Sequence, residues 1–145
     1  MDITRRSDYA CRILRAAYNS GDLPISVSEI AEIENIPYAF ARSIQHDLVK
    51  GGLVKANRGA RGGLVLNCDP VEVTVLDVLE SVQGPVTIAH CVGDAEFCDK
   101  RDVCAYNQVW RGVDKLLQDY LSAITLDELF KQGGDHPVIK EVLDA

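Results

Sequence analysis

The sequence predicts a mainly α-helical protein with one short β-hairpin near its middle. Apolar residues recur at three- and four-residue steps through most of the 145 residues, which is the spacing of a single helix face. Two short apolar runs, at residues 53–57 and 64–66, are instead separated by a glycine-rich turn, which is typical of a hairpin. The length corresponds to about one domain.

The composition is that of an ordinary globular chain, with 47% hydrophobic and 26% charged residues. No apolar run approaches the roughly 18–20 residues needed to cross a bilayer. The N-terminus also lacks the apolar core of a signal peptide. We therefore expect a soluble, cytoplasmic protein whose five cysteines are ligands or free thiols and not disulfides.

The net charge of −7 is unevenly distributed along the chain. Residues 1–66 hold nine Lys or Arg against seven Asp or Glu, whereas residues 67–145 hold six against fifteen. The first half can therefore meet an anionic partner that the second half would repel. The alternative is that the asymmetry has no functional meaning in an acidic protein.

Three helices are expected in the first 50 residues. The first covers residues 3–19 and is followed by helix-stopping glycine and proline. The second begins at a capping box, in which Ser26 and Glu29 exchange hydrogen bonds, and ends near Asn35, because the residue before a proline avoids the α conformation. The third covers residues 37–50.

The second and third helices, joined by a tight turn, are typical of a helix-turn-helix. The two expected strands follow directly, and a basic turn with the sequence Arg58-Gly59-Ala60-Arg61-Gly62-Gly63 joins them. A basic, glycine-rich hairpin directly after a helix-turn-helix is the wing of a winged-helix DNA-binding domain. We assign this domain to residues 1–70.

The second half of the chain predicts a short helix, a loop and a long helix. The short helix is expected over residues 75–82, the loop over residues 85–102 and the long helix from Cys104 to Ile124. One side of the long helix is an apolar stripe, which a second copy of the chain would cover most economically; packing on its own domain is the alternative. We therefore expect residues 71–130 to form a cysteine loop and a long C-terminal dimerisation helix, and residues 131–145 a flexible tail.

Three cysteines, Cys91, Cys98 and Cys104, lie near this loop with the spacing C-x6-C-x5-C. Thiolates are soft donors that suit iron–sulfur clusters, zinc or copper(I). Structural zinc sites favour pairs of CxxC clamps, which neither gap fits, whereas longer gaps let a loop wrap a multi-iron cofactor. Three thiolates leave one position for a fourth ligand. The alternative is three unrelated loop thiols. Cys11 and Cys68 are interpreted as small buried residues.

The order of helix, capped helix-turn-helix, basic wing, helix and three-cysteine loop resembles the IscR/NsrR family of bacterial regulators. The resemblance extends from Ile3 to Phe130 and implies homodimeric winged-helix proteins that bind DNA and sense iron–sulfur status, nitric oxide or redox stress through a cluster. The matching segments are TRRSDYA at residues 4–10, VKGGLV at 49–54, RGARGG at 58–63, the three loop cysteines and ITLDEL at 124–129.

The resemblance also suggests the fourth ligand. In the branch that monitors cluster supply, a His three residues after the third Cys completes a 2Fe–2S site, and that position is Asn107, a poor iron ligand. In the nitric-oxide-sensing branch, an Asp near the partner's N-terminus ligates a 4Fe–4S cluster, and Asp8 stands at that place. We expect an iron–sulfur cluster, 4Fe–4S in preference to 2Fe–2S, held by the three loop cysteines and by Asp8. His90 is the alternative fourth ligand. If Asp8 or His90 is not a ligand, we expect its side chain to be solvated.

Candidate DNA contacts come from the third helix and the wing. Arg42 is the best base reader, because its guanidinium can pair bidentately with guanine; the alternative is a solvent-facing residue paired with Asp47. Arg58 and Arg61 would contact phosphates or enter a minor groove, unless the turn is merely solvated. The expected DNA contacts are Tyr38, Ala39, Arg42, Ser43, His46, Arg58 and Arg61.

The sequence therefore predicts a DNA-binding transcriptional repressor without catalytic residues or a membrane partner. We expect a homodimer that binds a palindromic operator in double-stranded DNA and senses nitric oxide, redox state or iron–sulfur status. One alternative is a cluster-free regulator of the same family that uses its cysteines as redox thiols. A less favoured one is a small thiol or metal oxidoreductase, although the chain lacks a CxxC pair and a His/carboxylate set near the cysteines.

Overall fold

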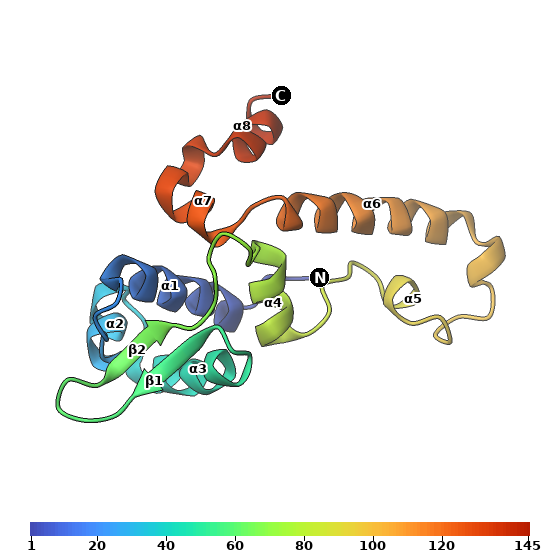
Figure 1. Ribbon diagram of the computed structural model, residues 1–145. Coiled ribbons are helices and arrows are strands. Elements are labelled where there is room, and N and C mark those ends of the chain that lie inside the picture. The colour runs from blue at the N-terminus through green and yellow to red at the C-terminus, as the bar shows by residue number, and fades with distance from the viewer.

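The computed structural model describes all 145 residues and is mainly helical, with a single two-stranded sheet (Figure 1). A compact body holds the N-terminal helices and the sheet, and one long helix projects from it with an irregular segment running alongside. None of the helices combines the length and apolar character that crossing a bilayer requires.

Three helices build the N-terminal body: α1 (Arg5–Ser20), α2 (Val27–Ile33) and α3 (Tyr38–Lys50). The Thr4 hydroxyl caps α1 by accepting from the Ser7 amide. The capping box of Ser26 and Glu29 is present at the start of α2 as predicted. These local signals fix where the helices begin, and each predicted helix lies within two residues of its observed bounds.

The wing consists of β1 (Val54–Asn57) and β2 (Gly63–Leu66), which pair antiparallel with Val54 opposite Leu66. Ile25 extends this sheet by exchanging two backbone hydrogen bonds with Leu64. Gly63 is required beside it, because a Cβ there would lie 2.5 Å from the Ile25 carbonyl carbon. The backbone before α2 therefore anchors the base of the wing.

The remaining helices are α4 (Val75–Gln83), α5 (His90–Gly93), α6 (Ala105–Ser122), α7 (Leu126–Gln132) and α8 (Pro137–Leu143). Helix α8 differs from our expectation of a flexible tail over residues 131–145. Pro137 occupies its first turn, and the ring of buried His136 caps it by accepting from the Val138 amide. His136 and Pro137 thus start a helix, although Gly133 and Gly134 before them favoured an irregular segment.

A core of 16 buried residues joins the three N-terminal helices and the wing. Val78 of α4 and Leu126 of α7 belong to the same core, so both helices are packed on the winged-helix body. Helix α6 contributes no residue to this core. The long helix is therefore held to the rest of the chain by contacts of another kind.

Candidate DNA-binding surface and cysteine loop

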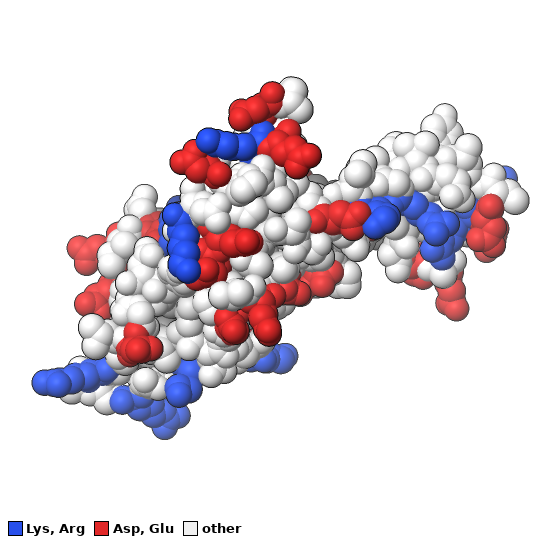
Figure 2. All heavy atoms as spheres, turned by 45° about the horizontal axis from the view of Figure 1, so that its top comes forward, with Lys and Arg blue, Asp and Glu red and all other residues white.

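Helix α3 is two-sided, as its sequence pattern predicts. Ala41, Ile44 and Leu48 are completely buried against the body. The candidate contacts on the helix all lie on its exposed side, and the two wing arginines are exposed as well: Tyr38, Ala39, Arg42, Ser43, His46, Arg58 and Arg61. Figure 2 shows Lys and Arg side chains gathered along the lower edge of the molecule, where Figure 1 places α3 and the wing. This edge is suited to an anionic partner.

Arg6 of α1 reaches the same surface, which the sequence analysis missed. Its Nε donates to Oδ2 of Asp47 at 2.8 Å, and its Nη2 donates to Ser43 Oγ at 3.1 Å. Asp47 is therefore paired with Arg6, and the alternative pairing with Arg42 is wrong. Arg42 instead donates from Nη1 to the Tyr38 hydroxyl at 3.3 Å. No sequence signal points to the Arg6 contact, because its partners are distant along the chain.

The cysteine segment is partly ordered by short turns, α5 and the 3₁₀ turn Arg101–Val103. The thiols of Cys91, Cys98 and Cys104 are free and half-buried. Thiol donors fit a soft metal or an iron–sulfur cluster in their chemistry. Within a single chain, however, no three His, Cys, Asp or Glu side chains are grouped to hold a metal ion. One chain alone therefore does not assemble the expected site.

The two candidate fourth ligands have other neighbours within the chain. Asp8 forms an ion pair with Arg12 at 2.7 Å and lines a hollow between α1 and the segment of α7 and α8, beside Phe130. The His90 ring stacks on Phe97 with centroids 5.3 Å apart. The structure thus places His90 in the cysteine loop and Asp8 on α1.

Polar side chains on one face of α6 hold the chain segment that leads to Cys91. Asn107 Nδ2 donates to the Cys91 carbonyl at 3.0 Å. Asp114 Oδ1 accepts from the Ile88 amide at 2.9 Å, and Gln118 Nε2 donates to the Val86 carbonyl at 3.2 Å. Asn107 and Asp114 are buried, although α6 lies outside the main core. We call Asn107, Asp114 and Gln118 the polar seam.

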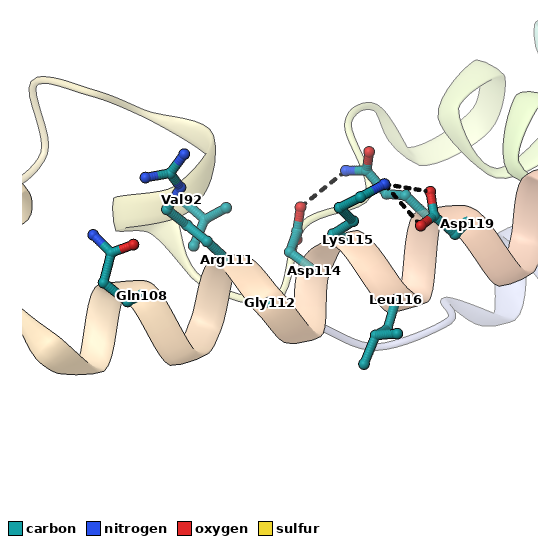
Figure 3. Close-up of a pocket in the computed structure, with 9 residues that line it drawn as sticks. Val92, Gln108, Arg111, Gly112, Asp114, Lys115, Leu116 and Asp119 are labelled. Atoms are coloured by element: carbon teal, nitrogen blue, oxygen red, sulfur yellow. Dashed lines mark hydrogen bonds and ion pairs between the residues drawn. The ribbon is translucent and has the colours of Figure 1, made fainter.

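The other side of α6 is apolar and open. In Figure 3, Asp114 hydrogen-bonds on the side that carries Val92, while Leu116 points away from it. Tyr106 and Trp110 stack on each other with centroids 6.4 Å apart. The exposed apolar side chains of this helix, which we call the outer face, are Tyr106, Val109, Trp110, Val113 and Leu116. Such a face on a projecting helix is typical of an interaction surface.

The remaining two cysteines pack against the hydrophobic core, as expected. Burial raises the pKa of the Cys11 thiol to about 11, and the nearby Asp8 carboxylate adds to the shift. Burial also raises the pKa of Cys68. Since the thiolate is the form that binds metals and reacts, neither residue is suited to be a ligand.

Comparison with known proteins decides the family. Residues 3–132 match the family model of Rrf2, described as iron-dependent transcriptional regulators. The chain belongs to the Rrf2 family. This Rrf2 protein is 32% identical to the HTH-type transcriptional regulator IscR of Pectobacterium carotovorum over 99% of its own length and 84% of that relative. The corresponding regulator of Photorhabdus laumondii is 31% identical over the same shares.

Solved structures confirm the fold class of this Rrf2 protein. CymR, the global cysteine regulator of B. subtilis, superimposes with a TM-score of 0.76 at 24% identity, over 90% of this chain and 97% of that one. IscR of T. potens gives 0.72 at 23% identity, over 90% and 87%. The mainly helical architecture with a wing is therefore that of the family. Its relatives are transcriptional regulators, which supports DNA binding through the helix-turn-helix.

Proposed function

We propose that this Rrf2 protein is a homodimeric repressor that binds a palindromic operator and senses nitric oxide, redox state or iron–sulfur status through an iron–sulfur cluster. Residues 1–70 read DNA, and residues 71–130 sense and dimerise. The observation that carries the proposal is the two-sided helix α6. Its polar seam holds the cysteine segment, while its outer face is open to a second chain.

A second copy of the chain is the proposed cover of the outer face. The residues of this face carry no charge, and Leu116 is 71% exposed, so water contact is unfavourable along the helix. A two-fold axis would place the same apolar residues against each other.

The proposed cluster ligands are Cys91, Cys98, Cys104 and Asp8 of the partner subunit, with 4Fe–4S favoured over 2Fe–2S. The three cysteines of one chain are not grouped in the structure, so the loop would have to bring them together when the cluster binds, and Asp8 of the partner subunit would fill the fourth position. When bound, the cluster would supply iron that reacts with oxidants and nitric oxide. A ligand set shared between chains would let the cluster favour one of two dimer geometries, which is the requirement for switching DNA affinity.

A cluster-free regulator that uses the same cysteines as redox thiols is the second candidate. It is supported by the likeness to CymR, described as a global cysteine regulator, and by the three half-buried loop thiols, which form no disulfide. In that case oxidation of the thiols, and not loss of a cluster, would change the loop next to α6.

One experiment separates the two candidates. Protein purified without oxygen is examined by visible absorption, together with its iron and acid-labile sulfide content. Charge-transfer bands, together with nearly equal molar amounts of iron and acid-labile sulfide, would support the cluster. Colourless protein that stays colourless after reconstitution with iron and sulfide contradicts it and supports the redox-thiol regulator.

The dimer is tested separately by sedimentation. Val113→Glu places a charge in the middle of the outer face and should shift the protein to a monomer. Gln108→Glu is the matched control, since it is exposed on the same helix but does not belong to this face. A dimer that survives Val113→Glu unchanged would contradict the proposed interface.

A further inference from the structure

The hydroxyl of Ser43 is held by a residue from another helix. Ser43 lies on the exposed side of α3, and its Oγ accepts from Arg6 Nη2 at 3.1 Å. Arg6 is itself fixed by Asp47, which accepts from Nε at 2.8 Å and from Nη2. A guanidinium held by two charge-assisted bonds has little freedom, so Arg6 presents a constant donor to Ser43.

This contact affects which hydrogen-bonding groups Ser43 offers to a partner. A serine hydroxyl has one O–H donor and two acceptor lone pairs. Arg6 occupies one lone pair and repels the hydroxyl hydrogen, and the Ser43 hydroxyl donates to no acceptor in the structure. Its O–H is therefore directed away from Arg6 and remains free to donate, beside one lone pair that can still accept.

Tyr38 is arranged in the same way one turn earlier on α3. Its hydroxyl accepts from Arg42 Nη1 at 3.3 Å, which leaves the phenolic O–H as an outward donor. The guanidinium of Arg42 carries only donors. His46, on the next turn, can act as a hydrogen-bond donor or as an acceptor. The exposed side of α3 from Tyr38 to Ser43 thus presents mainly donors.

Guanine is the base that best matches such a surface. Its major-groove edge carries two acceptors, N7 and O6, whereas adenine offers one acceptor beside a donor, thymine one acceptor beside a methyl group, and cytosine a donor. We propose that Arg6 is a positioning residue that sets Ser43 as a donor, so that α3 selects guanine edges in each operator half-site. This proposal rests on the proposed function, in which α3 reads the major groove.

The test begins with selection of half-sites from random duplexes by the wild-type protein. Each guanine of the selected site is then replaced in turn by 7-deazaguanine, which lacks the N7 acceptor. We expect one such position to lose about three- to tenfold in affinity, the range of a single hydrogen bond. Ser43→Ala and Arg6→Ala should each abolish the loss at that same position, and the double variant should add nothing further.

Control variants distinguish a positioning role of Arg6 from an effect on protein folding and from the loss of its charge. Ser43→Thr keeps the hydroxyl and should restore the sensitivity to 7-deazaguanine. Arg6→Lys keeps the charge but cannot make the same paired contacts, so it should behave like Arg6→Ala. Arg5→Ala removes a charge from the same turn of α1 without touching Asp47 or Ser43, and should leave the preferred base unchanged.

Three outcomes would overturn the proposal alone, and a fourth would overturn the proposed function as well. Arg6→Ala could weaken all duplexes equally with a flatter salt dependence, which would make Arg6 a phosphate contact. Ser43→Ala and Arg6→Ala could affect different base pairs, or the selected site could lack guanine opposite α3. Wild-type protein that selects no sequence at all would contradict the proposed function itself, and this inference with it.

Discussion

Asn107 on α6 donates to the backbone carbonyl of Cys91, with 3.0 Å between Nδ2 and the oxygen. Asn107 is only 2% exposed, and its Oδ1 has no hydrogen-bond partner in the structure. The contact of Asn107 is therefore a structural one within the chain. It ties the first loop cysteine to the helix that carries the outer face.

Replacing Asn107 should loosen Cys91 without affecting DNA contacts. Asn107→Asp keeps the size of the side chain but places a carboxylate against the Cys91 carbonyl, which should lower the free energy of unfolding by about 1–3 kcal/mol. In a Cys98→Ser/Cys104→Ser background without metal, Cys91 should be alkylated several-fold faster. Gln108→Glu is the control. An unchanged alkylation rate would show that the hydrogen bond does not position Cys91.

The loop cysteines and the two cysteines that pack against the core should differ in their effect on the cluster. Cys91→Ala, Cys98→Ala and Cys104→Ala should each abolish visible charge-transfer absorption, because each removes a proposed ligand. Cys11→Ala and Cys68→Ala should preserve it, since both side chains pack against the hydrophobic core, away from the cysteine loop. Full iron and sulfide content in Cys98→Ala protein would contradict the proposed ligand set.

Two arginines should affect DNA binding in different ways. Arg42→Ala should reduce discrimination between operator and random DNA by about 1–3 kcal/mol, if it reads a guanine. Arg61→Ala should weaken all duplexes to a similar extent and flatten the salt dependence. Both are measured by titrating fluorescent duplexes at several salt concentrations. If both variants bind as the wild type does, α3 and the wing are not the contact surface.

Asp8→Ala tests the proposed ligand from the partner subunit. A carboxylate is a harder and more labile iron donor than a thiolate. The variant should therefore remain a dimer but lose its cluster faster and respond differently to nitric oxide. His90→Ala should do neither. The decay of visible absorption under air or a nitric oxide donor measures this difference.

Mixed dimers test whether Asp8 acts between chains. In a dimer of one Asp8→Ala chain and one Cys98→Ala chain, one site loses both ligands and the other keeps all four. About half of the normal cluster content should therefore return. If mixing restores nothing while His90→Ala alone removes the cluster, the fourth ligand is His90 of the same chain.

The rate at which Cys11 is alkylated should depend on pH. Its pKa is raised to about 11, so the unreactive neutral thiol prevails through the neutral range, and labelling should rise only as the pH approaches that value. Because the folded pKa lies above the unfolded one, the neutral thiol stabilises the fold below about pH 9, and this contribution is lost as the pH rises through 11. Rapid labelling of Cys11 in native protein at pH 8 would show that the thiol is not protected.

The sequence by itself determined the features that depend on neighbours along the chain. The capping box of Ser26 and Glu29 closes within three residues, and the glycine-rich turn fixes the hairpin of the wing. The apolar spacing of α3 likewise gave its buried and exposed sides. Helices α7 and α8 were not expected from this local reasoning. The start of α8 depends on His136, which also contacts Glu128.

Tertiary structure alone decided which distant polar groups meet. Arg6 pairs with Asp47 across 41 residues, and Asn107 reaches Cys91 across 16. A hydrogen bond of this kind depends on how two elements are packed, and it leaves no periodic pattern in the sequence. The sequence could therefore place the candidate DNA contacts on an exposed helix face, but only the packing of α1 on α3 showed which of them is held by a neighbour.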